Sequence, residues 1–129
     1  MAAEGVEWYD TAIRRFSDAI RLDPRSSNAY INRGVAYVEK GECDAAIADY
    51  TEAIRLDPSD PFVFSSRGIV YMRKRQYEKA ITDFTKTIRL EPKFAAAYRA
   101  RGLAYKHLGK LSEAEADFAE AKKRGYSKK

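Results

Sequence analysis

The sequence predicts an all-α protein, a solenoid of stacked antiparallel helix pairs with about seven helices in total. The first observation is a repeat: "NRGVAY" at residues 32–37 returns twice, as "SRGIVY" and as "ARGLAY", at a spacing of 34 residues. The second is the apolar spacing inside each copy, for example Ile47, Tyr50 and Ile54, which is that of one buried helix face. A period of this length is typical of proteins that stack one small structural unit.

The repeat divides a single domain, residues 1–129, into one half copy and three full copies. The half copy is residues 1–26, and the full copies are residues 27–60, 61–94 and 95–128. Two apolar stretches in each full copy are separated by a short polar break, such as "KGECD" or "KRQYE". Each full copy is therefore predicted to be two antiparallel helices, A followed by B.

The half copy corresponds to a helix B without a helix A. Its segment "WYDTAIRRFSDAIRLDP" matches "ECDAAIADYTEAIRLDP" one period later, and only six or so residues precede it. Ala12, Phe16 and Ile20 recur at helical spacing on the face that a helix A would cover in a complete copy. We expect the preceding part of a longer protein, or a second molecule, to cover this face. In the second case, these three residues form a self-association site.

Two helix starts are predicted from local signals. Asp60 followed by Pro61 is typical of an N-cap with proline in the first helical position. Ser112 with Glu115 three residues later is predicted to be a capping box that opens helix B of the last copy.

Large aromatic, glycine, tyrosine, alanine and proline residues return at matching places in the full copies, except that one alanine position holds threonine and the last proline position holds tyrosine. In chain order they are Tyr30, Gly34, Tyr37, Ala46, Tyr50, Ala53 and Pro58; Phe64, Gly68, Tyr71, Ala80, Phe84, Thr87 and Pro92; and Tyr98, Gly102, Tyr105, Ala114, Phe118 and Ala121, with Tyr126 at the last proline position. This pattern resembles that of the tetratricopeptide repeat (TPR) family over nearly the whole chain. The resemblance implies a right-handed superhelix whose helices A line a concave groove that binds peptides.

The repeat glycines lie inside helix A, where glycine costs roughly 1 kcal/mol relative to alanine. We therefore expect another helix to cross there too closely for a side chain, with the repeat aromatics filling the gaps beside it. An arginine precedes each glycine, at Arg33, Arg67 and Arg101, and an acid follows each arginine by sixteen residues, at Asp49, Asp83 and Asp117. The spacing predicts an ion pair between helices A and B of one copy, rather than a set of arginines for an anionic ligand. In the half copy the equivalent of the aspartates is Arg15.

No catalytic or cofactor-binding pattern is evident in the sequence. His107 is the only histidine and Cys43, in a predicted turn, the only cysteine, and they belong to different copies. The glycines are single and the repeat glycines are intrahelical, unlike those of a phosphate-binding loop. We expect a non-enzymatic protein without a metal or cofactor.

The TPR resemblance also implies a set of groove residues. They are Asn28, Ile31, Asn32, Val35 and Glu39 in the first full copy; Phe62, Ser65, Ser66, Ile69 and Arg73 in the second; and Arg99, Leu103, Lys106 and His107 in the third. A TPR subclass clamps the terminal carboxylate of chaperones with lysine, asparagine and arginine. The matching places here hold Ile31, Val35, Ser66, Ala96 and Ala100. This mismatch disfavours chaperone C-terminal peptides as partners.

Charge is unevenly distributed along the chain. Residues 1–60 carry seven basic and twelve acidic side chains, a net −5, whereas residues 61–129 carry seventeen and seven, a net +10. The expected partner is a protein or peptide with an acidic segment and apolar anchors, bound near Arg73, Arg99 and Lys106. Self-assembly into a homo-oligomer through the unfinished ends is the alternative, and nucleic-acid binding by the basic half is a weaker one. The absence of a membrane span and the single cysteine favour a cytoplasmic setting.

Overall fold

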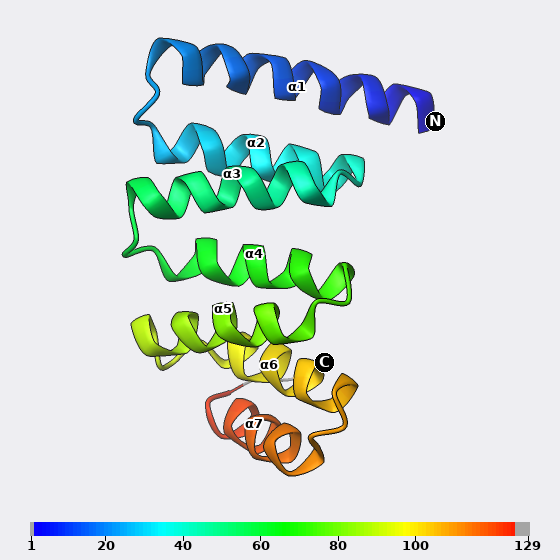
Figure 1. Cartoon of the computed structure of the whole chain (residues 1–129), viewed down its shortest axis with the longest axis vertical. Coiled ribbons are helices and arrows are strands. Elements are labelled where there is room, and N and C mark those ends of the chain that lie inside the picture. Colours follow the sequence, from blue (N-terminus) through cyan, green and yellow to red (C-terminus); the bar gives the residue numbers. More distant parts are fainter. Residues whose placement is uncertain (1, 126–129) are drawn as a thin grey trace. The chain divides into compact units, whose positions relative to one another are not determined.

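The computed structural model describes the backbone of residues 2–125 and the side chains of residues 7–125. The described part of the chain contains seven α-helices and no strand, which confirms the predicted all-α class and helix pairs (Figure 1). The helices are α1 (Ala2–Leu22), α2 (Ser27–Lys40), α3 (Cys43–Leu56), α4 (Pro61–Arg73), α5 (Tyr77–Leu90), α6 (Ala95–His107) and α7 (Leu111–Lys123).

The helices form two compact units, Met1–Ser59 and Asp60–Lys129. In the first unit α1 packs on α2, and α2 pairs with α3. In the second unit α4 pairs with α5 and α6 pairs with α7, while α5 packs on α6 and α4 also contacts α6. No helix in the described residues is both long enough and apolar enough to cross a membrane.

The first helix is longer than its place in the repeat predicts. Helix B of the next copy, α3, has 14 residues and begins at Cys43, whose counterpart one period earlier is Tyr9. In contrast, α1 has 21 residues and begins at Ala2. The preceding sequence, "AAEGVEW", contains alanine and glutamate, which are strong helix formers, and this explains why the helix continues through it. Figure 1 shows the N-terminal end of α1 extending past the end of α2.

One predicted helix start is confirmed and the other is wrong. The side chain of Asp60 accepts a hydrogen bond from the amide of Phe62 at 2.9 Å, and Pro61 is the first residue of α4. Helix α7 instead begins at Leu111 after Lys110, without a side-chain cap, so Ser112 does not cap it. The residues that precede the three full-copy helices B, namely Glu42, Gln76 and Lys110, are spaced by one period. The start of α7 therefore follows the position of helix B in the repeat. It does not follow the local capping signal at Ser112.

The repeat glycines allow the close helix crossing that their position predicts. A Cβ atom on Gly34 would lie 2.8 Å from Cε1 of Tyr50, and one on Gly68 would lie 2.7 Å from Cε1 of Phe84. Both rings are buried in the contact between helices A and B of their copy. Not all repeat aromatics are core residues, however: Tyr37, Tyr71, Tyr105 and Phe118 are only half-buried.

Candidate functional site

Each repeat arginine makes a two-pronged ion pair with the aspartate sixteen residues later, as predicted. The Nε and Nη2 atoms of Arg33 donate to the two carboxylate oxygens of Asp49 at 2.8 and 2.7 Å. The corresponding distances are 2.9 and 2.8 Å for Arg67 with Asp83, and 2.8 and 2.8 Å for Arg101 with Asp117. Each pair joins helices A and B of one copy.

The third guanidinium nitrogen of Arg33 and that of Arg101 each reach the preceding helix. Nη1 of Arg33 donates to the hydroxyl of Ser17 on α1 at 3.0 Å, and Nη1 of Arg101 donates to that of Thr85 on α5 at 3.1 Å. One guanidinium thus connects three consecutive helices in each of these cases. These two hydroxyl partners were not predicted from the sequence, because only an acidic partner was considered in the preceding copy. The available signal was a hydroxyl sixteen residues before each arginine.

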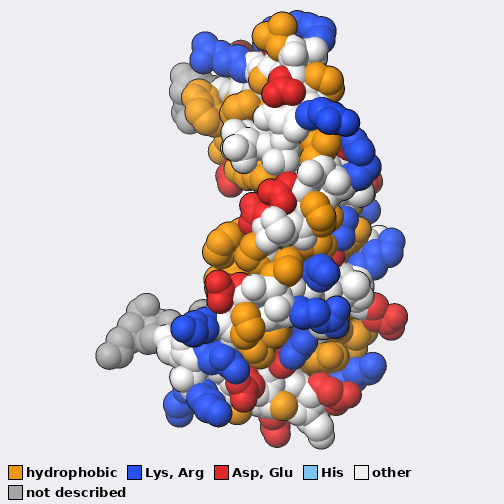
Figure 2. Space-filling view, turned by 90° about the vertical axis from the view of Figure 1, so that its left-hand side faces the viewer, with side chains coloured by type: hydrophobic (Ala, Val, Ile, Leu, Met, Phe, Trp, Pro, Cys, Tyr) orange, Lys and Arg blue, Asp and Glu red, His pale blue; other side chains and the backbone are white. Residues whose placement is uncertain are grey.

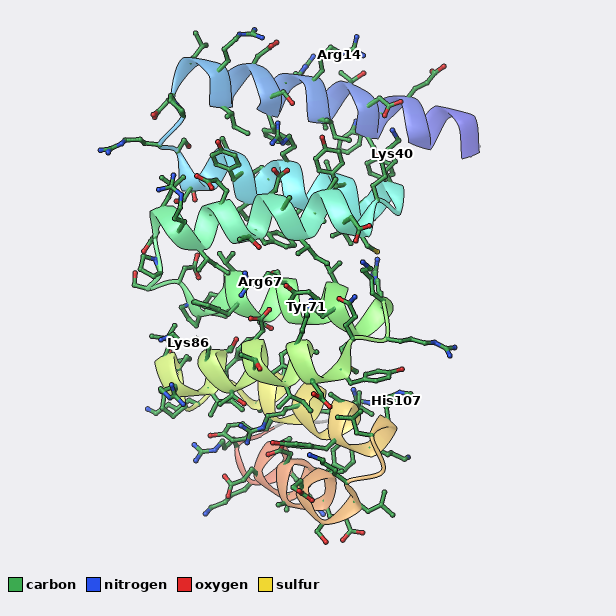
Figure 3. The ribbon with its side chains drawn as sticks, in the orientation of Figure 1. Arg14, Lys40, Arg67, Tyr71, Lys86 and His107 are labelled. Atoms are coloured by element: carbon green, nitrogen blue, oxygen red, sulfur yellow. The ribbon has the colours of Figure 1, made fainter. Side chains whose placement is uncertain are left out.

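Aromatic rings flank each guanidinium three residues before and four residues after it. The Cζ atom of Arg67 lies 5.9 Å from the ring centre of Phe64 and 5.8 Å from that of Tyr71, and Figure 3 shows Arg67 and Tyr71 on α4. Such distances are typical of cation–π contacts. Arg33 and Arg101 have equivalent tyrosine neighbours at 5.7–5.9 Å. The tyrosine of each repeated motif thus contacts the arginine of the same motif.

The ion pairs affect the protonation of their members. Hydrogen bonding to the partner carboxylate raises the pKa of Arg33, Arg67 and Arg101, so these side chains remain charged. Burial raises the pKa of Asp83, and the guanidinium of Arg67 acts in the opposite direction. The three arginines therefore act as structural cross-links.

Most of the predicted groove residues are accessible in their own unit. On α2 of the first unit, Asn28, Asn32, Val35 and Glu39 are exposed and Ile31 is half-buried. On α4 and α6 of the second unit, Phe62, Ile69, Arg73, Lys106 and His107 are exposed, whereas Ser65, Ser66, Arg99 and Leu103 are half-buried. Figure 2 shows Lys and Arg side chains spread over the part of the drawn face that the second unit forms.

Two of the predicted groove residues in the second unit, His107 and Phe62, make ring contacts with neighbouring aromatic side chains. The imidazole of His107 stacks on the ring of Tyr77, with 4.6 Å between the ring centres and 3° between the planes. The ring of Phe62 meets Phe94 edge to face, with 5.2 Å between their centres. His107 is therefore exposed, but one face of its ring is covered.

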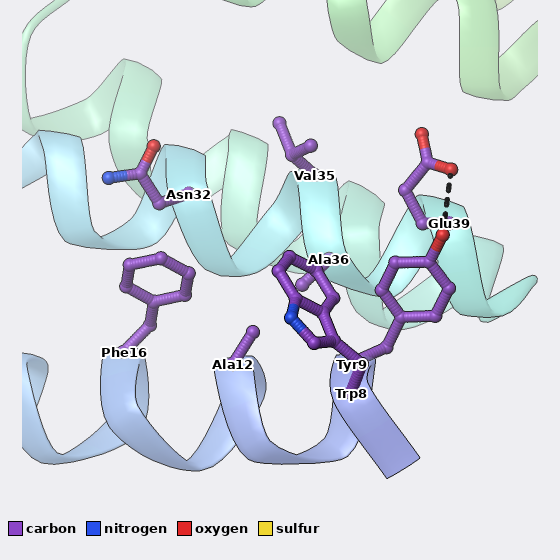
Figure 4. Close-up of a pocket in the computed structure, with 8 residues that line it drawn as sticks. All are labelled: Trp8, Tyr9, Ala12, Phe16, Asn32, Val35, Ala36 and Glu39. Carbon is purple, nitrogen blue, oxygen red and sulfur yellow. Dashed lines mark hydrogen bonds between the residues drawn. The ribbon is translucent and has the colours of Figure 1, made fainter. Parts of the chain in front are cut away.

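A pocket of about 410 Å³ lies between α1 and α2 in the first unit (Figure 4). Its lining is mainly apolar, and the Tyr9 hydroxyl donates to the Glu39 carboxylate at 3.4 Å at one end. The lining residues are Trp8, Tyr9, Ala12, Phe16, Asn32, Val35, Ala36 and Glu39.

The pocket contains two of the three residues predicted for self-association, Ala12 and Phe16. The third, Ile20, is half-buried outside it. Phe16 is also half-buried, and Figure 4 shows its ring directed toward α2. The face predicted to be uncovered is thus partly covered by the chain's own next helix.

The described residues contain no cluster of three or more side chains suited to hold a metal ion. Cys43 is the first residue of α3, rather than a turn residue as the sequence predicted, and it is half-buried.

Family models match two overlapping parts of the sequence. One is described as "TPR repeat" and matches residues 36–74, and the other, "Tetratricopeptide repeat", matches residues 66–127. None of the curated proteins matches the sequence.

Solved structures of several proteins are similar to this chain. Two crystal structures of MamA are 33% identical to it over 90% of its length, with TM-scores of 0.88 and 0.86, and the chain spans 68% and 63% of their lengths. The second TPR of Spaghetti (RPAP3), bound to the HSP90 peptide SRMEEVD, is 30% identical with a TM-score of 0.72. That comparison covers 76% of this chain and 92% of the RPAP3 domain.

Proposed function

The chain belongs to the tetratricopeptide repeat family, whose members are generally non-enzymatic scaffolds for protein–protein interaction, and we propose that it binds a peptide segment of a partner protein. The segment is acidic and carries one or two apolar anchors. It binds to the exposed faces of helices A, which include α4 and α6 in the second unit.

The observation that carries this proposal is the composition of the second-unit helix A face. Phe62 and Ile69 are large apolar side chains exposed on α4, and Arg73 in the last turn of the same helix is exposed as well. Lys106 occupies the last turn of α6. Apolar anchors and cations on one pair of contacting helices suit a partner that combines apolar and acidic residues.

The similar RPAP3 domain supports the same partner chemistry. Its bound peptide, SRMEEVD, combines acidic residues with methionine and valine. This chain has no lysine, asparagine or arginine at the five clamp positions, from Ile31 to Ala100. We therefore propose that acidic and apolar side chains are recognised, and that a terminal carboxylate is not required.

Although the clamp mismatch disfavours chaperone C-terminal peptides as natural partners, the peptide SRMEEVD is a suitable probe of acidic and apolar side-chain recognition when it is prepared with a free and with an amidated C-terminus. We expect both forms to bind the full chain with similar affinity in a fluorescence-anisotropy titration. Arg73→Glu with Lys106→Glu should abolish binding. The matched control is Lys122→Glu with Lys123→Glu, which makes the same charge change in the last turn of α7 and should have little effect.

Three results would contradict the proposal. Equal loss in both double variants would mean that only net charge matters. Unchanged affinity in the Arg73 and Lys106 variant would exclude the helix A face. Binding of the free acid alone would mean that a carboxylate clamp operates despite the residues at its positions.

A further inference from the structure

The α1–α2 pocket has a filled counterpart within the same chain. Two repeat periods are 68 residues, so α5 corresponds to α1 and α6 corresponds to α2. The counterparts of Ala12 and Phe16 are therefore Ala80 and Phe84, and both are 0% exposed. Helix α4 packs against both α5 and α6, and its Gly68 lies against the ring of Phe84. Among the described residues of the first unit, no helix takes the part of α4, and the corresponding space beside Phe16 is the open pocket.

The filled counterpart indicates what shape of ligand the pocket takes. Helix α4 places Gly68 against the ring of Phe84, where even a Cβ atom would approach to 2.7 Å. Its Phe64 and Val70 are buried on the same helix. A ligand for the first-unit pocket should therefore be an amphipathic helix with a small residue where it crosses Phe16 and apolar residues on either side.

The charge beside the pocket is the reverse of that in the complete copies. Asp83 pairs with Arg67, the residue directly before Gly68. The residue of α1 in the place of Asp83 is Arg15, which is exposed. A ligand helix that lies across α1 as α4 lies across α5 would place its small residue on Phe16. The residue directly before that small residue would then lie beside Arg15. An acidic residue there would be attracted, and a basic residue would be repelled.

The same reversal argues against a second copy of this chain in the pocket. Its helices A carry Arg33, Arg67 or Arg101 before the glycine, and each of these arginines is already paired within its own copy. A symmetric contact through two α1 helices would bring Arg15 toward its own equivalent. Both arrangements place like charges together.

We propose that the α1–α2 pocket binds an amphipathic helix of another protein, with Asp or Glu directly before a Gly or Ala that packs on Phe16. This rests on the proposed protein-binding function of the chain, but not on recognition of an acidic peptide by the second unit. The ligand helix crosses Phe16 with its small residue, and its carboxylate pairs with Arg15.

Two synthetic peptides provide a matched probe. Both span residues 60–74, "DPFVFSSRGIVYMRK", which contain helix α4. The test peptide carries Arg67→Glu, and the control peptide keeps the arginine. Trp8 is the only tryptophan of the chain, lines the pocket and is 66% exposed, and neither peptide contains tryptophan. A blue shift of Trp8 emission therefore reports binding at this pocket.

We expect the Glu peptide to bind the full chain about tenfold more tightly than the Arg peptide. The variant Arg15→Asp restores the charge found in complete copies and should reverse this preference. Circular dichroism checks that the variant keeps its helix content, and the exposed position of Arg15 favours this. A Glu peptide with Gly68→Phe should not bind, because its ring would collide with Phe16.

Several results would overturn the proposal. They are equal affinity of the two peptides, an unchanged preference in Arg15→Asp, and no Trp8 shift with either peptide. Sedimentation with an apparent mass that rises with concentration, abolished by Phe16→Glu, would instead identify a second copy as the occupant. The SRMEEVD titration distinguishes the two proposals, because Arg73→Glu with Lys106→Glu should leave binding of the helix peptide unchanged.

Discussion

At the scale of single residues, the arginine before each repeat glycine performs several structural tasks at once. It pairs with an aspartate on helix B and lies between two aromatic rings, and Arg33 and Arg101 each donate to a hydroxyl on the preceding helix. The aspartates are almost fully buried, with a side-chain exposure of 3% for Asp83. A buried carboxylate of this kind depends on its partner, because an unpaired charge is costly to bury.

Truncating Arg67 alone should therefore destabilise the protein by about 3–5 kcal/mol, since Asp83 would be left buried without its partner. We expect this for Arg67→Met in chemical denaturation at neutral pH. The double variant Arg67→Met with Asp83→Leu should recover most of the loss, because apolar residues often replace a buried pair without a large cost. A double variant as unstable as the single one would contradict this.

The destabilisation should also depend on pH. Burial already raises the pKa of Asp83, and loss of the guanidinium in Arg67→Met removes the effect that lowers it. A carboxyl whose pKa is raised in the folded state binds protons better when folded, so its stabilising contribution is present at low pH and is lost as pH rises through that pKa. The deficit of Arg67→Met should thus be smaller near about pH 4 than at neutral pH.

The sequence predicted these ion pairs but not the rest of their surroundings. A fixed spacing of sixteen residues between opposite charges, repeated three times, is readable without a structure. The hydroxyls of Ser17 and Thr85 are not as readable, because serine and threonine occur in many helical positions and only the packing angle brings these two within reach of a guanidinium. Similarly, the repeat does not predict that Trp8, which precedes the expected start of this helix at Tyr9, lines the α1–α2 pocket.

At the scale of helices, the three full-copy helices B begin at equivalent positions of the repeat, without a side-chain cap. A local capping signal determines the start of α4, a helix A. Gly109 takes a left-handed conformation with φ +77° after the α6 C-cap residue Leu108, and only Lys110 then separates it from α7. Ser112 is therefore already inside the helix. The start of α4 differs, because Asp60 caps it through a real hydrogen bond.

Asp60→Ala should therefore lower the free energy of unfolding by about 1 kcal/mol, since it removes the side-chain acceptor for the Phe62 amide. Asp60→Asn keeps an acceptor oxygen and should cost much less. Ser112→Ala is the matched control, and it should change stability by less than about 0.5 kcal/mol. Urea denaturation of the three variants measures this difference. An equal loss in Asp60→Ala and Ser112→Ala would mean that Ser112 caps α7 in solution.

At the scale of the whole molecule, charge differs between the two parts of the sequence more than fold does. Residues 1–60 carry a net −5 and residues 61–129 a net +10, although both are built from helices of the same repeat. Copies of one structural unit can keep their core residues while their surface charges diverge. The basic part raises the question of whether it binds nucleic acid or acidic peptides, since both are polyanions.

Salt separates these two ligands. Binding through phosphate contacts alone falls steeply with ionic strength, by roughly 10³–10⁵ between about 50 and 200 mM salt for six to ten contacts. Peptide binding that combines apolar anchors at Phe62 and Ile69 with a few ion pairs should fall much less, because burial of apolar surface is not screened.

We expect a single-stranded oligonucleotide to bind weakly at about 50 mM salt and to be lost at about 200 mM, whereas amidated SRMEEVD remains bound. Phe62→Ser should weaken the peptide and leave the oligonucleotide unaffected. Tight oligonucleotide binding that persists at about 200 mM salt would instead assign the basic helices to nucleic acid.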